Sequence, residues 1–362
     1  VEQLPKCLLF WRSFTHWIGG MGVLVFLLSV LPMVGGSHMN LMKAESPGPI
    51  VSRLVPKVQM TAKLLYQIYL GMTVLEAVIL ILGKMPIFDA ITITVGTAGT
   101  GGFAIRNDSL ASYTAFQKNV VTVFMILFGV NFNFYFFLLM QKIGQAFKMQ
   151  EVRAYFLIIA SAVGIITVNT VSLGGNALQA FQDAAFQVGS VITTTGYVTV
   201  DFDKWPQLSR TIMVLLMFIG ACAGSTGGGI KVSRVLILLK SVKKELKQYL
   251  HPSVVEKIKM DGKIVEHEVV RSTNVFMVAY VLIFAVSVLL ISLDEYDLVT
   301  NFTAVTATFN NIGPGLALVG PTGNFGFFSN FSKLVLIFDM LAGRLEIFPL
   351  LLLFSRETWK RF

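Results

Sequence analysis

The chain has 362 residues, of which 54% are hydrophobic and only 14% are charged. Its mean hydropathy of +0.71 gives it more apolar surface than one soluble core can bury, which excludes an ordinary soluble protein. The formal net charge of +9 does not indicate nucleic acid, because the basic residues gather in particular loops and do not alternate with exposed aromatics. We therefore expect membrane lipid around the chain and no nucleic-acid partner.

In chain order, seven apolar segments each come near the roughly 20 residues that a membrane-spanning helix needs. They are residues 16–34, 62–82, 120–140, 155–173, 211–239, 274–293 and 333–354. The sequence therefore predicts an all-α, multi-pass membrane protein.

Basic residues concentrate in three of the connections between these segments. One connection carries Arg53 and Lys57, the next carries Lys142, Lys148 and Arg153, and the third is the long stretch 231–271. By the positive-inside tendency these loops are cytoplasmic.

Three short tracts rich in Thr, Asn and Gly interrupt the apolar sequence, at residues 97–103 (tract 1), 193–197 (tract 2) and 310–314 (tract 3). The stretches before them align without gaps on Gly102, Gly196 and Gly313. Each stretch is too short to span but long enough for a half-membrane helix, with Asp89, Asp183 or Asn301 near its expected start. Because few basic residues follow the tracts, we expect them to face outward. Irregular backbone at membrane depth is tolerated only inside protein or beside water, so the tracts predict re-entrant pore loops.

The repeat also divides the chain into units of outer helix, half-helix, tract and second helix. We assign residues 61–150 to a second unit, 151–245 to a third, and 246–362 to a cytoplasmic linker and a fourth. Residues 1–60 match only the second helix of a unit plus a cytoplasmic loop, so we expect a further pore loop upstream of Val1. The predicted fold is a pseudo-fourfold repeat of helix–pore-loop–helix units around a central pore, with the first unit incomplete.

The tracts have the chemistry of a cation filter. Backbone carbonyls from converging loops can replace the water shell of a cation, glycine permits the dihedral angles required, and the C-terminal ends of half-helices carry partial negative charge. No carboxylate lies within a tract, so a ring of acids is not indicated. The predicted potassium-filter residues are Thr100, Gly101, Gly102, Thr194, Thr195, Gly196, Asn311, Ile312 and Gly313.

The glycines have two other possible interpretations. Gly and Thr in membrane helices also permit close helix packing, but three tracts in register argue against packing alone. Residues 99–102 and 224–231 look superficially like phosphate-binding loops. Neither meets the P-loop pattern, because Ile230 separates the last glycine from Lys231 and no strand precedes either segment.

At these residues the chain resembles the Trk/Ktr/HKT superfamily of potassium transporters, and most closely the bacterial TrkH-type membrane subunit. The resemblance covers essentially the whole chain and includes the three tracts, the segments 17–22, 44–49 and 220–231, and Gly343-Arg344-Leu345-Glu346. It implies a homodimer in the bacterial plasma (inner) membrane and a cytosolic nucleotide-binding ring of the TrkA type. Potassium is the implied substrate, no cofactor is covalently bound, and nucleotide is expected on the partner only.

The resemblance further implies an intramembrane gate below the filter, formed by a break in the third unit's second helix. Seven glycines or alanines between Gly220 and Gly229 agree with this, because such residues lower the cost of unwinding. Arg344 is interpreted as a positive element beneath the filter, and the alternative is a structural ion pair with Glu346 or Asp339. The expected gate residues are Gly220, Gly224, Ser225, Thr226, Gly227, Gly228, Gly229, Lys231 and Arg344.

The predicted function is potassium uptake, and the alternative is an ion-coupled carrier for sodium or ammonium. A carrier with alternating access would favour inverted repeats and titratable residues at mid-membrane, whereas these repeats are parallel and their tracts lack His, Asp and Glu. An enzyme is not expected, because the four histidines are scattered and no metalloprotease or serine-hydrolase motif occurs.

Overall fold

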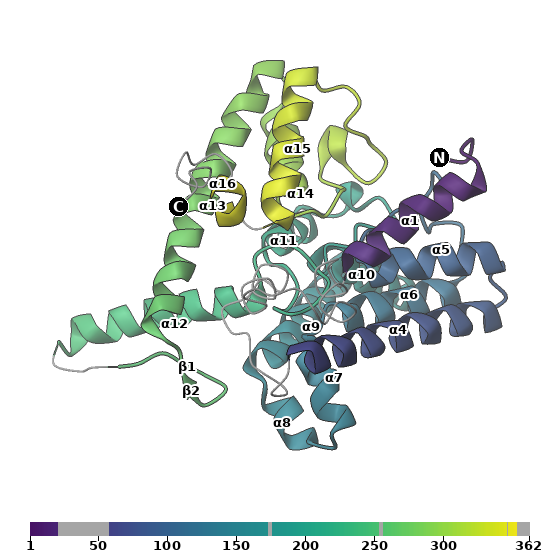
Figure 1. The fold of residues 1–362 in the computed structure, drawn as a ribbon. Helices are drawn as coiled ribbons and strands as arrows, with labels where there is room; N and C mark the ends of the chain where they lie inside the picture. Colours follow the sequence, from purple (N-terminus) through teal and green to yellow (C-terminus); the bar gives the residue numbers. More distant parts are fainter. Residues whose placement is uncertain (21–57, 173–175, 253–255, 346, 353–362) are drawn as a thin grey trace, which may run out of the picture.

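The computed structural model describes residues 1–20, 58–172, 176–252, 256–345 and 347–352, and these are mostly helical (Figure 1). The first half contains α1 (Lys6–Gly20), α4 (Val58–Leu82), α5 (Ile87–Ala98), α6 (Ala115–Phe128), α7 (Phe132–Leu139), α8 (Ile143–Lys148) and α9 (Gln150–Val171). The second half contains α10 (Ala177–Ile192), η1 (Phe202–Lys204), α11 (Gln207–Phe218), α12 (Val232–Leu250), β1 (Lys259–Met260), β2 (Lys263–Ile264), α13 (His267–Ile291), η2 (Ser292–Asp294), α14 (Leu298–Phe309), η3 (Ala317–Val319), α15 (Asn330–Arg344) and α16 (Ile347–Leu352).

Within the described ranges, α4, α9 and α13 are long and apolar enough to cross a membrane. The pair α6 and α7 passes the same criterion together, although the two helices are bent by 91°. The predicted span 16–34 and the end of 333–354 lie partly outside the described residues, as do the 44–49 motif, the basic loop with Arg53, and Glu346. The described spans establish a multi-pass helical chain.

Three of the predicted spans are not continuous helices. The segment 333–354 divides into α15 and α16, and the break in 211–239 lies where the glycines from Gly220 to Gly229 were expected to unwind the helix. The break in 120–140 corrects the prediction of a single span. The segment 120–140 breaks between Phe128 and Phe132, where Gly129 packs under Tyr155 and the side chain of Asn131 caps α7. The segment 211–239 ends as α11 at Phe218 and resumes only at Val232 as α12, whose later turns are basic. Hydropathy predicted where apolar sequence lies but not where tertiary contacts interrupt the helix.

Three short helices, α5, α10 and α14, occupy the positions of the expected half-helices. Each packs between its two neighbours in sequence: α5 between α4 and α6, α10 between α9 and α11, and α14 between α13 and α15. Each also packs against the second helix of the preceding segment, in the pairs α1 with α5, α6 with α10, and α11 with α14. Figure 1 shows the first of these groups, with α4, α5 and α6 side by side and α1 against α5.

The starts of the half-helices differ from the prediction. Asp183 lies well inside α10, whose N-terminus is instead capped by Asn176. Asp297 caps α14 by accepting a hydrogen bond from the backbone N–H of Thr300, and Asn301 lies within the helix. Asp89 does lie in the first turn of α5, where it accepts a hydrogen bond from the Tyr113 hydroxyl. The acidic residues that align in sequence therefore do not share one capping role.

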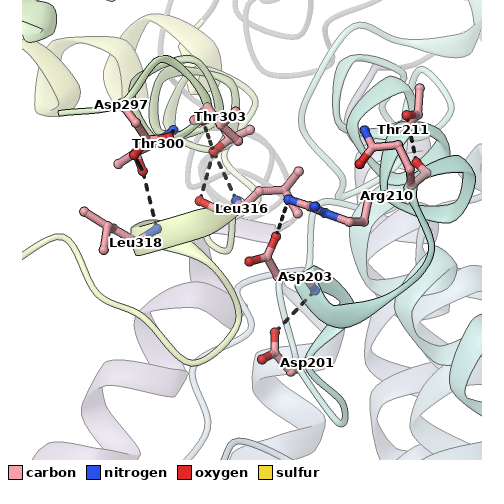
Figure 2. A network of polar contacts seen from close by, with 11 residues as sticks. Asp201, Asp203, Arg210, Thr211, Asp297, Thr300, Thr303, Leu316 and Leu318 are labelled. Atoms are coloured by element: carbon pink, nitrogen blue, oxygen red, sulfur yellow. Dashed lines mark hydrogen bonds and ion pairs between the residues drawn. The ribbon is translucent and has the colours of Figure 1, made fainter.

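The connections that follow tracts 2 and 3 are fixed by polar contacts (Figure 2). Arg210 forms an ion pair with Asp203 at 2.8 Å, joining the start of α11 to the preceding 3-10 turn. The hydroxyl of Thr303 in α14 donates to the carbonyl of Leu316 and accepts from its N–H. These contacts tie each returning connection to a neighbouring helix and so fix the position of the tract before it.

Candidate functional site

The three tracts have the same backbone conformation. In each, a residue with positive φ follows the half-helix: Thr100 at 48°, Thr194 at 57° and Asn311 at 57°. Its N–H donates to the carbonyl three residues back, at 3.0 Å in every tract, and the next N–H donates five residues back, at 2.8 to 2.9 Å. This is the Schellman pattern that ends a helix, here made with non-glycine residues in the left-handed position. The equivalent backbone is the strongest structural link between the tracts.

The tract glycines also have positive φ, and two of them lie against carbonyl groups of the next tract. Gly102, Gly196 and Gly313 have φ of 65°, 84° and 109°. A Cβ at Gly102 would lie 1.8 Å from the carbonyl oxygen of Thr195, and one at Gly196 would lie 2.0 Å from that of Ile312. Tract 1 therefore touches tract 2, and tract 2 touches tract 3. A Cβ at Gly313 would meet nothing within 4 Å.

A cavity of about 850 Å³ lies beside the meeting point of the tracts. Tract backbone lines it together with His16 and Gly19 of α1 and with Met340 and Arg344 of α15. A Cβ at Gly101 would overlap the His16 ring, so glycine is required there for the close approach of α1. Among the described lining residues there is no carboxylate, so the available ligands are mainly carbonyl and hydroxyl oxygens.

The break between α11 and α12 forms a second glycine-rich segment, residues 219–231, which we call the glycine-rich loop. Its ends lie together in a parallel bridge between Ile219 and Ile230, and the N–H of Gly220 donates to the Ile230 carbonyl at 2.8 Å. Between these ends, Gly224 and Gly229 have φ of 65° and 69°. Glycine suits these two positions, because other residues rarely adopt such angles.

The middle of the glycine-rich loop lies against tracts 1 and 2. The Thr100 hydroxyl donates to the Thr226 carbonyl at 2.8 Å, and the N–H of Gly228 donates to the Thr194 hydroxyl at 2.6 Å. Arg344 donates to the same Thr226 carbonyl at 3.1 Å and to the carbonyl of Gly19 at 3.2 Å. The loop, α15 and α1 therefore meet at the end of the tracts.

A smaller cavity, of about 240 Å³, lies on the loop side of this contact. Residues 225–231 line it with Arg344 and Gly19, and these last two also line the larger cavity. The loop and Arg344 therefore lie between the larger and the smaller cavity. Asp339, one suggested ion-pair partner of Arg344, accepts instead from the Ser287 hydroxyl at 2.6 Å, and the other, Glu346, lies outside the described residues.

The structure brings the predicted residues together as follows. Thr100, Gly101, Gly102, Thr195, Gly196, Asn311, Ile312 and Gly313 line the larger cavity, and Thr194 contacts the glycine-rich loop. The buried Lys231 donates to the Gly227 carbonyl within the loop, and the Ser225 hydroxyl donates to the backbone carbonyl of Cys222 at 2.6 Å. Gly220 lies against Gly228 and Gly229 at the base of the loop, and Gly224 lies beside Asn131.

Two residues with important positions were not singled out from the sequence. His16 is one of four histidines that are scattered in the sequence, yet it lines the tract cavity. Glu151 sits in the first turn of α9, buried, with its carboxylate on the glycine-rich loop. Its partner Ala223 is 72 residues away, and no local pattern signals that contact.

The fold and site define a class of protein: a multi-pass helical membrane protein in which three half-helices end in tracts that lie against one another. The family model described as TrkH, cation transport protein, matches residues 1–361. The chain belongs to this family.

Individual relatives agree. The Trk system potassium uptake protein TrkH of Salmonella typhimurium is 36% identical over 368 residues, covering 99% of this chain and 75% of the relative. The Trk system potassium uptake protein TrkG of Escherichia coli K12 is 33% identical over 369 residues, with the same coverage of both chains. The crystal structure of the potassium transporter TrkH from Vibrio parahaemolyticus superposes with a TM-score of 0.85 at 35% identity, covering 99% of this chain and 74% of that one. These matches are to bacterial membrane transport proteins and not to an enzyme family.

Proposed function

We propose that this protein takes up potassium across the bacterial plasma membrane through a filter of backbone carbonyls. The observation that carries the proposal is the shared backbone of the three tracts, each ending a half-helix and each in contact with the next. Carbonyl oxygens held at such a point can replace the hydration shell of a cation without a trapping negative charge. The names of the relatives, which are potassium uptake proteins, agree with this substrate.

The filter is proposed to comprise residues 100–102, 194–196 and 311–313. The packing of each half-helix between its own two helices and the second helix of the preceding segment supports a pseudo-fourfold arrangement of helix–pore-loop–helix units. The half-helix C-termini add partial negative charge at the meeting point, which favours cations. The unit boundaries at residues 60, 150 and 245 stay predictions, as do the outward position of the tracts and the cytoplasmic position of the basic loops.

The glycine-rich loop is proposed as the gate. Its middle is bonded to Thr100 and Thr194 and to Arg344, so in this structure it lies where the tracts would open toward the smaller cavity. The positive guanidinium beside the path would oppose cation passage while the loop is in place. Homodimer assembly and regulation by a cytosolic nucleotide-binding ring are part of the same proposal and rest on the family resemblance.

The test is ion flux into vesicles containing the purified full-length protein, with potassium, sodium or ammonium outside and a controlled membrane potential. We expect potassium to enter in preference to the other two ions and to follow the potential. Flux of sodium or ammonium that is equal or larger, or flux that requires a proton gradient, would favour the ion-coupled carrier instead. Arg344→Gln tests the gate, because it should raise basal potassium flux without changing the ion preference.

A further inference from the structure

Glu151 makes an unusual set of contacts for a carboxylate at the start of a membrane span. It is the second residue of α9 and is only 5% exposed. One oxygen, Oε1, accepts from the N–H of Ala223 at 2.6 Å and from the N–H of Ser233 at 3.1 Å. The other, Oε2, accepts from the amide of Asn131 at 3.2 Å. Hydrogen bonds to an ionised acceptor are about twice as strong as neutral ones.

The two backbone donors lie on opposite sides of the moving part of the proposed gate. Ala223 comes directly before Gly224, and Ser233 comes after Gly229, so both glycines with positive φ lie between them. Ser233 is in the first turn of α12, where backbone N–H groups have no partner within the helix. A single oxygen therefore joins the two ends of the segment 223–233, which contains the middle of the glycine-rich loop, and leaves the residues between the two glycines to move.

Two further hydrogen bonds join the break between α6 and α7 to the residues on either side of Ala223. The Gly129 carbonyl accepts from the N–H of Cys222 at 3.0 Å, and the N–H of Phe132 donates to the Gly224 carbonyl at 3.0 Å. A continuous helix would use these backbone groups internally, so the 91° bend makes them available to the loop. The bend also places Asn131 where it can reach Glu151.

We propose that Glu151 is a positioning residue that holds both ends of the segment 223–233 and so sets how readily the middle of the glycine-rich loop leaves the tracts. The inference rests on the gating role proposed above. Without the carboxylate charge, the ends separate more easily, the middle loses its fixed approach to Thr100 and Thr194, and the closed arrangement is populated less.

The experiment uses Cys222, a natural and buried reporter within the loop. The full-length protein is prepared with Cys222 as its single thiol, reconstituted in vesicles, and treated with a small water-soluble thiol reagent while potassium flux is recorded. Because charge-assisted hydrogen bonds contribute roughly 1.5–3 kcal/mol, Glu151→Gln should speed modification of Cys222 by about ten- to a hundredfold. Basal potassium flux should rise with it.

The matched control is Glu268→Gln. Glu268 is also the second residue of a long spanning helix, α13, but it is exposed. Its substitution should therefore change neither the rate of Cys222 modification nor the potassium flux. Unchanged Cys222 modification in a folded Glu151→Gln protein would overturn the proposal, whatever the flux does. Faster modification in both Glu151→Gln and the charge-retaining Glu151→Asp, with unchanged flux, would support the role of Glu151 in holding the loop and overturn the loop as a gate.

A second variant covers the case in which Glu151→Gln does not yield a monodisperse protein. Glu151→Asp keeps the charge on a side chain that is shorter by one methylene, so its hydrogen bonds to the N–H groups of Ala223 and Ser233 should be weaker. It should speed modification of Cys222 by a smaller factor than Glu151→Gln does. Equal modification rates in Glu151→Asp and the unsubstituted protein would overturn the proposal.

Discussion

The three tracts and the glycine-rich loop have similar compositions, yet their conformations are held in different ways. Each tract is fixed by hydrogen bonds to its own half-helix, three and five residues back. The middle of the loop is fixed by distant partners, which include Thr100, Thr194 and Arg344. A segment held locally keeps its shape wherever it is placed, whereas one held by tertiary contacts can be released when they change. This difference suits a filter that stays constant and a gate that moves.

The largest effect is expected from Gly196→Ser. The new side chain would need φ of 84° and would place its Cβ 2.0 Å from the Ile312 carbonyl, so two neighbouring tracts must move. Strain of about 1–3 kcal/mol for the backbone alone should cut potassium uptake at least tenfold and admit sodium. Uptake of both ions in a cell deficient in potassium transport measures the change.

Gly313→Ser provides the comparison for this prediction. Its φ of 109° is also unfavourable for serine, but a Cβ there meets nothing within 4 Å. We expect a smaller loss of selectivity than at Gly196. Equal effects at both positions would show that contact between tracts does not determine selectivity.

Gly227→Ala should push the loop away from Thr193 at the start of tract 2 while leaving the filter residues 194–196 in place. A Cβ there would lie 2.5 Å from the Ala221 Cβ and 2.9 Å from the Thr193 carbonyl, in a crowded part of the loop. Overpacking of this kind costs about 1–3 kcal/mol, so basal potassium flux should rise with unchanged selectivity. Gly144→Ala in the short helix α8, where nothing lies within 4 Å, should leave flux unaltered. Altered selectivity in Gly227→Ala would contradict the separation of filter and gate.

Thr194→Val tests the hydroxyl that joins tract 2 to the loop. The substitution leaves the N–H of Gly228 without its 2.6 Å acceptor, at a cost of about 1–3 kcal/mol for a buried donor. Basal flux should increase several-fold, and Thr194→Ser, which keeps the hydroxyl, should behave as the unsubstituted protein. Thr306→Val is the matched control, because that hydroxyl bonds only to the Phe302 carbonyl of its own helix. Flux that rises equally in both valine variants would point to a general loss of stability.

The smallest effect is expected at the start of the third half-helix. The Thr300 hydroxyl donates to Asp297 and keeps the pKa of this carboxyl below its ordinary value. Asp297→Ala should therefore remove about 1 kcal/mol of capping stability and slightly lower the thermal unfolding midpoint in detergent. Because the folded pKa is the lower one, this contribution is complete above pH of about 4–5 and is lost as pH falls through the folded value. A difference between the proteins that persists at pH 2 would exclude the carboxylate as its source.

Much of this arrangement could be predicted from the sequence, for reasons that are local. The alignment of tracts 1, 2 and 3 needs only residue spacing, and the half-helices α5, α10 and α14 follow from apolar stretches too short to cross a bilayer. The family follows from motifs that are contiguous in the chain, and the family match to residues 1–361 confirms that prediction.

Other features depended on contacts that no local pattern records. The bend of α6 and α7 was predicted as a straight span, because hydropathy does not register that Gly129 packs under Tyr155. Asp183 was predicted near a helix start because it aligns with Asp89, yet α10 begins at Asn176.

By itself the sequence determined composition, apolar lengths and the glycine positions, because hydropathy and backbone dihedral preferences are properties of short segments. Only the tertiary structure decided which tract carbonyl lies against which glycine and which tracts the glycine-rich loop contacts. It also decided that the Glu151 carboxylate accepts hydrogen bonds from the loop. Thr100 and Thr226 are 126 residues apart in the chain, and Glu151 and Ala223 are 72 apart. Such pairs meet only when several helices pack at once, so their contact energies belong to the whole fold.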